Sequence, residues 1–190
     1  MKLSSYTLGL AMLVALSACS TSKADKIDAD KKEAETKKDQ PLPICPQVAI
    51  IRDLDDMKDF GTEKPDPAEL VSQARMLNVT GECEYKDNGI DVRFDLNFAA
   101  AKGPRLGGLR VSFPYFIAVV APDKTILNKD KMTVEFSFSS DKKTIEHAES
   151  LHVFIPLPKA QRSFGPDYQV LSGFQLDEDQ VKMIRGGAKP

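Results

Sequence analysis

The sequence predicts an antiparallel β-sandwich of seven or eight strands, followed by a short C-terminal helix. Residues 90–98 alternate apolar and polar side chains with a strict period of two, which is typical of a strand with one buried face. Residues 115–121 are apolar at every position, as expected of a central strand covered on both faces. Turn sequences separate such runs at regular intervals, and this spacing favours a sandwich of the immunoglobulin or fibronectin-III type.

The segment before residue 90 is predicted to form the hairpin partner of this strand. Asp87-Asn88-Gly89 is a hairpin signal, and a two-residue turn at Asn88-Gly89 places Cys83 opposite Phe94 on the core side. Further upstream, residues 66–69 (DPAE) are typical of a helix start, because a capping residue precedes a proline. The apolar residues that follow share one parity and favour a long strand, or a short turn that leads into one: Val71, Leu77, Val79, Cys83 and Tyr85.

The rest of the domain is expected to continue as strands joined by polar turns. Residues 121–124 (APDK) are typical of a turn, and a short strand is expected at residues 126–127. Further strands are expected over residues 132–139, 151–157 and 168–174, the last two separated by a proline-containing loop.

A short helix is predicted at the C-terminal end. Asp177 is expected to cap it, with Gln180 at the third helical position. Leu176 and Val181 have the spacing of a hydrophobic staple, and Gly186 is expected to end the helix.

The N-terminal segment has the order of a secretory signal. Lys2 gives a short basic start, residues 6–18 are almost wholly apolar, and small residues precede Cys19. The apolar run is shorter than the about 20 residues that a bilayer-spanning helix needs. We therefore expect residues 1–18 to be exported and removed.

The end of this signal resembles the lipobox of bacterial lipoproteins, Leu16-Ser17-Ala18-Cys19. The resemblance implies that the Cys19 thiol carries a thioether-linked diacylglycerol and that cleavage occurs just before it. An ordinary signal peptide with a chance cysteine is the alternative. Since two or more acyl chains hold a protein firmly on a bilayer, a triacylated Cys19 would be a permanent anchor.

Residues 19–44 are expected to join this lipidated cysteine to the folded domain as a flexible, charged linker. Residues 20–44 contain six lysines and six acidic residues and show no apolar periodicity. A charged solvated helix is the alternative, because several opposite charges lie three or four residues apart. The sandwich domain is then expected over residues 45–186, with a frayed tail at 187–190.

The remaining two cysteines, Cys45 and Cys83, are predicted to form a disulfide. With Cys19 acylated they are a pair in an exported protein, where oxidising conditions favour the bond. Free buried thiols are the first alternative. Metal ligation is the second, although no CxxC or Cys-His spacing accompanies them.

Composition and motifs argue against several classes of function. The net charge of −2 and the lack of a basic, aromatic-rich stretch exclude a nucleic-acid partner. His147 and His152 are an odd number of residues apart, so an extended segment points them to opposite faces, away from a shared metal site. No hydrolase, zinc or phosphate-loop motif is present, and we expect no catalytic residues, no metal and no cofactor.

Residues 102–108 (KGPRLGG) form the one loop that could bind a ligand or a partner. Arg105 and Arg110 could engage a carboxylate or a phosphate. The simpler interpretation, which we favour, is a strand connection that needs unusual backbone angles.

A broader resemblance covers most of residues 45–180. The segments Cys45-Pro46, Gly103-Pro104-Arg105, 114–130 (PYFIAVVAPDKTILNKD) and 173–180 (GFQLDEDQ), together with the Cys83 strand, are similar to small lipoproteins of alphaproteobacteria. Those proteins carry no assigned activity, so the resemblance implies location and fold and transfers no catalytic residue.

The expected function is that of a non-enzymatic lipoprotein, anchored in the bilayer through Cys19, that contacts an envelope protein. A small-ligand or carbohydrate-binding module is the alternative. Ser20 follows the modified cysteine, and the resemblance to Gram-negative lipoproteins then implies the periplasmic face of the outer membrane. Inner-membrane retention and a Gram-positive surface anchor are the other possibilities.

Overall fold

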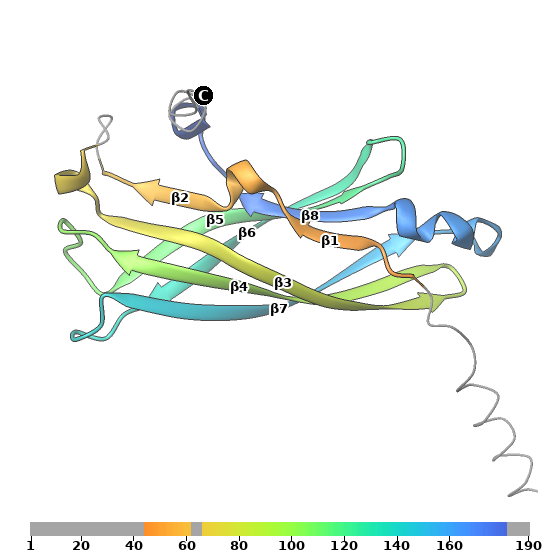
Figure 1. Cartoon of the computed structure of the whole chain (residues 1–190), viewed down its shortest axis with the longest axis horizontal. Coiled ribbons are helices and arrows are strands. Elements are labelled where there is room, and N and C mark those ends of the chain that lie inside the picture. The colour runs from red at the N-terminus through yellow and green to blue at the C-terminus, as the bar shows by residue number, and fades with distance from the viewer. Residues whose placement is uncertain (1–43, 62–65, 182–190) are drawn as a thin grey trace, which may run out of the picture. The chain divides into compact units, whose positions relative to one another are not determined.

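The computed structural model describes residues 44–61 and 66–181, in which eight strands form two four-stranded sheets packed face to face (Figure 1). The sandwich prediction is thus confirmed. One sheet has the order β1-β8-β5-β6 and the other β2-β3-β4-β7. All neighbours are antiparallel except β1 and β8, which run parallel. The strands are β1 (Gln47–Ile50), β2 (Asp56–Asp59), β3 (Ser72–Lys86), β4 (Gly89–Lys102), β5 (Arg110–Val120), β6 (Ile126–Ser137), β7 (Thr144–Pro156) and β8 (Gln169–Phe174).

Short 3-10 helices occupy three of the connections. They are η1 (Arg52–Leu54), η2 (Pro67–Glu69) and η3 (Lys159–Asp167). In η2 the Asp66 carboxylate accepts a hydrogen bond from the Ala68 N–H at 2.8 Å, so the predicted helix start is a single capped turn that leads into β3.

The hydrophobic core lies between the two sheets. As the period of two predicted, the inner face of β4 is buried from Ile90 to Phe98. The ring of Phe98 meets that of Tyr115 edge to face at 5.3 Å. Burying each such side chain stabilises the fold by about 1.5–3 kcal/mol.

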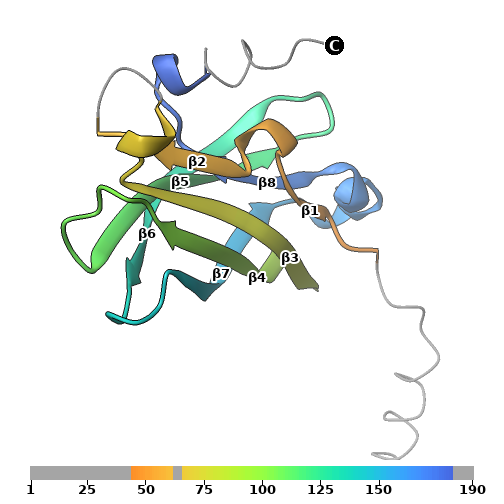
Figure 2. The same cartoon turned by 60° about the vertical axis from the view of Figure 1, so that its left-hand side comes forward.

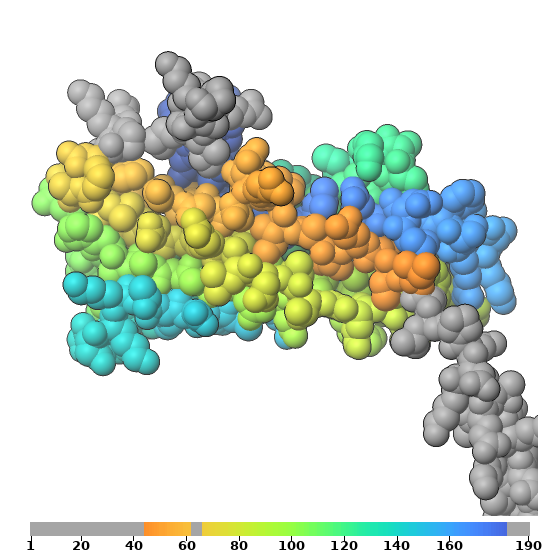
Figure 3. All heavy atoms as spheres, in the orientation of Figure 1, coloured from red at the N-terminus to blue at the C-terminus, as the bar shows by residue number. Residues whose placement is uncertain are grey.

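One margin of the sandwich is closed, and the opposite margin is not. β1 pairs with β8 in one sheet and packs against β3 of the other (Figure 2). Figure 3 shows this orange segment beside blue β8 residues above and yellow-green β3 residues below. At the other margin β6 and β7 are the last strands of their sheets.

The predicted hairpin forms, but its turn is one residue earlier. The turn residues are Asp87 and Asn88, and Lys86 pairs with Gly89, which places Cys83 opposite Val92 instead of Phe94. Gly89 is needed for a different reason: a Cβ there would lie 2.4 Å from the Ile155 carbonyl oxygen on β7. Since the pairing moves by two residues, Cys83 keeps its predicted face.

A β-bulge in β3 changes the predicted face of Leu77. The pairing shifts between Met76 and Asn78, so one extra residue interrupts the alternation. Met76 is buried and Leu77 is 44% exposed, whereas Val79 again packs against the core. The prediction that Leu77 shares a face with Val79 was therefore wrong.

Two further expectations concern the second half of the chain. The strands expected at residues 126–127 and 132–139 are one strand, β6, which pairs with β5 from Ile126 to Ser137 with one register shift beside Leu127. The capping box is confirmed: Gln180 N–H donates to the Asp177 carboxylate at 2.8 Å, and Asp177 N–H donates to the Gln180 amide oxygen at 2.9 Å. The predicted helix end at Gly186 lies outside the described residues.

Candidate functional site

The predicted disulfide between Cys45 and Cys83 is present. Their Cα atoms are 5.7 Å apart, within the usual range of 4.4–6.8 Å. The bond ties the chain just before β1 to the inner face of β3, and the Tyr85 hydroxyl donates to the Ile44 carbonyl at 2.9 Å beside it. The disulfide thus fastens the closed margin of the sandwich.

The loop between β4 and β5 keeps the two predicted arginines on different elements. Arg105 Nε lies 3.0 Å from the Glu69 carboxylate, and the Arg105 N–H donates to the Leu70 carbonyl. Arg110 begins β5 opposite Ser137 of β6. A Cβ at Gly103 would lie 2.0 Å from the Leu70 carbonyl oxygen, so glycine permits this close approach. The arrangement of Arg105 is that of a strand connection held against η2.

Polar side chains cross the outer face of the β2-β3-β4-β7 sheet, which is the side away from the core. One row runs from Glu82 on β3 through Arg93 on β4 to His152 on β7. In the next row Ser150 Oγ donates to the Asp95 carboxylate at 2.7 Å. These rows line a hollow of about 510 Å³, a volume typical of small-molecule sites.

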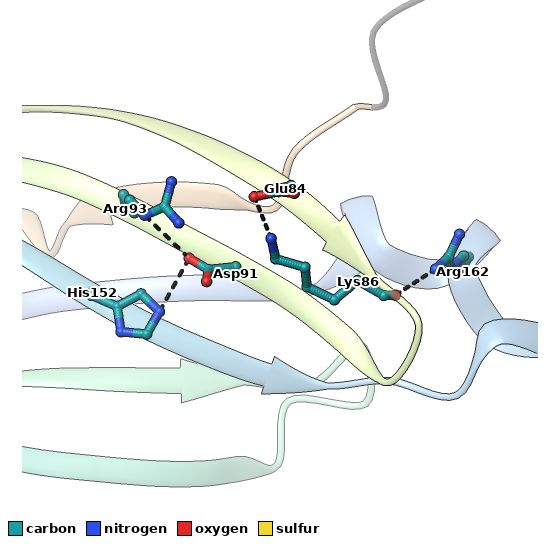
Figure 4. Close-up of polar contacts among 6 residues, drawn as sticks. All are labelled: Glu84, Lys86, Asp91, Arg93, His152 and Arg162. Atoms are coloured by element: carbon teal, nitrogen blue, oxygen red, sulfur yellow. Dashed lines mark hydrogen bonds and ion pairs between the residues drawn. The ribbon is translucent and has the colours of Figure 1, made fainter.

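Asp91 lies on the same outer face, beside the side chains of Arg93 and His152. Its Oδ1 atom is 3.1 Å from His152 Nε2 and 3.6 Å from Arg93 Nε (Figure 4). The Asp91 side chain is only 16% exposed, whereas that of Arg93 is 54% exposed and meets Asp91 through its Nε atom. The guanidinium fork therefore remains available on the outer face.

The backbone of β7 has one free side. At the two ends of its ladder with β4, Lys102 N–H donates to Lys143 O and Leu157 N–H donates to Asn88 O. Both of these residues on the β7 side, Lys143 and Leu157, are odd-numbered. Because hydrogen-bonded and non-hydrogen-bonded pairs alternate along an antiparallel ladder, the odd-numbered residues between them also bond to β4. The even-numbered residues from Thr144 to Phe154 turn their N–H and C=O groups away from it. Within residues 44–61 and 66–181 no strand pairs with that side.

The side chains along this edge leave it open to pairing. The even-numbered residues of β7 include one acidic side chain, Glu146, and no lysine or arginine. Phe154 is 40% exposed, and only Pro156, which has no N–H, ends the row of free donors. On β6, the edge strand of the other sheet at the same margin, Lys129 and Lys131 occupy equivalent outward positions, as is usual where pairing is discouraged. β7 is therefore the less protected edge.

A polar cluster lies on the inner side of β7. The hydroxyl of fully buried Tyr115 donates to the Glu149 carboxylate, whose other oxygen is 3.7 Å from His147 Nε2. Burial raises the pKa of Tyr115, and the bond to Glu149 and its negative charge raise it further. The cluster thus holds a neutral phenol against a carboxylate.

The other predicted features fall into two groups. His147 lies on the inner side of β7 and His152 on the outer side, as their odd separation predicted. Among the described residues no group of three or more histidine, cysteine or acidic side chains could hold a metal ion. The predicted signal peptide, Cys19 and the linker up to residue 43 lie outside the described residues.

The hollow and the free β7 edge were missed by sequence reasoning. The alternation of β4 predicted which of its side chains face outward. It did not predict that Ser150 and His152 of β7 would lie beside them. Residues 95 and 150 are far apart in the sequence, and no local pattern specifies their pairing.

No helix in the described part of the chain is long and apolar enough to span a membrane. Neither the protein-family models nor the curated proteins gave a match to this chain.

Proposed function

We propose that this protein is a non-enzymatic, membrane-anchored lipoprotein that serves as a structural or protein-interaction module of the cell envelope. The anchor is the lipid on Cys19, in the periplasmic leaflet of the outer membrane. The interacting surface is the free edge of β7.

The observation that carries the interaction role is the run of unpaired backbone groups on β7. Six residues from Thr144 to Phe154 each offer an N–H and a C=O to an incoming strand. Extended peptides add to sheet edges of this kind, and their main-chain bonds supply the affinity. An exported protein with such an edge is at risk of aggregation unless a partner covers it.

Site-specific photo-crosslinking in the intact envelope tests this role. A photoreactive amino acid in place of Ser150 is expected to capture a protein partner, because Ser150 lies at the centre of the free edge. The matched control is the same substitution at Thr133, an outward position on the lysine-protected β6 edge. Equal capture at both positions, or none at Ser150, would contradict the proposal.

The anchor is tested by lipid labelling and membrane fractionation. The wild type should incorporate labelled palmitate and sediment with outer-membrane markers, and Cys19→Ala should lose the label. Ser20→Asp is expected to shift the protein toward the inner membrane. A wild type found chiefly with inner-membrane markers would overturn the location and leave the anchor standing.

The outer-face hollow supports a second candidate, a small-ligand or carbohydrate-binding module. It offers the exposed Arg93 guanidinium, the Asp95 carboxylate and the Ser150 hydroxyl, and Phe154 exposes an aromatic ring on the same face. A rise in melting temperature with a member of a glycan panel, abolished by Arg93→Ala, would favour this candidate.

A further inference from the structure

We propose that the partner of β7 is β7 of a second copy of this chain, in an antiparallel pair centred on Glu149. The inference rests on the proposed function, because it names the occupant of the same edge. Its carrying observations are the extent of the free edge and the positions of Glu146 and His152 along it.

The extent of the edge selects the register. The free N–H and C=O groups run from Thr144 to Phe154, and Glu149 is the midpoint of this segment. An antiparallel pair centred there places Thr144 opposite Phe154 and lets all six outward-facing residues of each copy bond across. If one strand slides along the other in either direction, some of these N–H and C=O groups lose their partners or Pro156, which has no N–H, enters the ladder.

The same register places a carboxylate opposite an imidazole that can donate a hydrogen bond to it. Glu146 of each copy lies opposite His152 of the other, and the twofold axis produces this pair twice. At the centre the small side chains of Ala148 and Ser150 face one another, which lets the two strands approach without obstruction. In the register shifted by one residue on each strand, Glu146 would face Phe154 and the match would be lost.

The row of polar side chains on the outer face also continues from the sheet of one copy into the sheet of the other. In one copy a row runs from Glu82 through Arg93 to His152. In the pair it continues to Glu146 of the second copy and, two strands further, to Arg75 of that copy. Glu82 therefore lies beside Arg93, and Glu146 of the second copy lies beside His152, while Ala99 separates Glu146 from Arg75. Hydrogen-bond acceptors thus meet donors along the joined outer face, and this complementarity favours a second copy as the partner.

One contact opposes the pair, and it supplies a test. Glu149 of each copy would face Glu149 of the other across the axis on the inner side. The hydroxyl of Tyr115 and the ring of His147 draw this carboxylate away from the edge. Glu149→Gln keeps an oxygen that can accept from Tyr115 and removes the repulsion, so it is expected to strengthen the pair.

Cysteine crosslinking of the full-length, membrane-bound protein tests the register. Cells express two differently tagged copies, one carrying Ala148→Cys and the other Ser150→Cys, and the membranes are treated with a mild oxidant. In the proposed register these positions are opposite, at about 5.5 Å between Cα atoms, which suits a disulfide. We expect a reducible, doubly tagged dimer.

Two matched controls accompany this pair. Ala148→Cys in both copies places the thiols diagonally, beyond the about 7 Å limit for a disulfide, and Thr133→Cys in both copies lies on the other edge. Both should give at least about fivefold less dimer. No dimer from the opposite pair, or equal yields from the controls, overturns the proposal.

Charge exchange tests the pairing of Glu146 with His152 independently. Glu146→Lys alone removes the carboxylate that accepts from His152, and His152→Glu alone brings two carboxylates together, so each should lower the crosslinked fraction at least about fivefold. The double variant should restore it, and Glu149→Gln should raise it. Failure of the double variant to restore dimer, or a fall with Glu149→Gln, overturns this register.

The outcome separates the inference from the proposed function. If photo-crosslinking at Ser150 captures a different envelope protein and never a second copy, this inference is wrong and the interaction role stands. If Ser150 captures nothing, both are wrong.

Discussion

Removal of the Cys45–Cys83 disulfide is expected to weaken the domain by about 4 kcal/mol. The two cysteines are 38 positions apart in the sequence. In the chain-entropy model, closing a loop of that length removes about 13 cal/mol/K from the unfolded chain, which corresponds to about 4 kcal/mol at 25 °C. The perturbation is the double variant Cys45→Ser with Cys83→Ser, so that no single free thiol remains.

The disulfide reinforces a short strand at the edge of its sheet. β1 is an edge strand of four residues, and its one ladder partner among the described residues is the six-residue β8. The disulfide is the covalent link that holds this short strand against β3. A loss of about 4 kcal/mol lowers the melting temperature of a domain of this size by roughly 8–16 °C.

Urea unfolding measures the effect. The chain has no tryptophan and four tyrosines, so circular dichroism together with tyrosine fluorescence follows the transition. Wild type and double variant are compared at one protein concentration, because self-association would shift the apparent stability. Added reductant should destabilise the wild type and leave the double variant unchanged. A difference in unfolding free energy below about 1 kcal/mol between the two proteins would refute the reasoning.

The remaining predictions concern a glycine in β4, the buried Tyr115 and the start of the folded domain. Gly89→Ala should lower the unfolding free energy by about 1–3 kcal/mol in urea titrations, because the added Cβ meets the Ile155 carbonyl at 2.4 Å. The pKa of Tyr115 is raised in the folded state, so its neutral hydroxyl contributes to the free energy of unfolding. This contribution is fully present below a pH of about 10, the ordinary pKa of a tyrosine in the unfolded chain, and is lost as the pH rises further. Tyr115→Phe should therefore flatten the fall of the urea midpoint between pH 9 and 11, while costing about 1–3 kcal/mol at pH 7 by leaving the Glu149 carboxylate without its donor; an unchanged alkaline slope would contradict this. A chain beginning at Pro43 should melt cooperatively in its oxidised form, and a gradual, non-cooperative loss of signal would show that the domain needs its N-terminal segment.

Where a short segment carries its own physical signal, the sequence predicted the structure closely. The capping box depends only on Asp177 and Gln180, and both of its hydrogen bonds are present. The period of two from residue 90 to 98 predicted the buried face of β4. These features succeed because the interacting groups lie within a few residues of each other, so no competing partner elsewhere in the chain can change them.

Pairings between segments that are distant in the chain could not be predicted from the sequence. Asn88-Gly89 has the composition of a two-residue turn, but the approach of β7 requires glycine at position 89 as a strand residue, and the turn moves back by one residue. The bulge at Leu77 likewise places this side chain on the outer face, although its spacing from Val79 in the sequence predicts the inner face for both. In both places a ladder formed across the sheet overrides a local preference.

The sequence by itself predicted the fold class, from local periodicity, and the pairing of Cys45 with Cys83, from the cysteine count, and the structure contains both. The anchor at Cys19 stays a prediction that rests on the resemblance to a lipobox. Only the tertiary structure decided that β7 is an open edge and that His152, Ser150 and Arg93 share one face. A strand's neighbours are chosen by the competition of all strands for backbone hydrogen bonds and for the core, and that competition is settled over the whole chain at once. The surface on which the proposed function depends is a product of that choice.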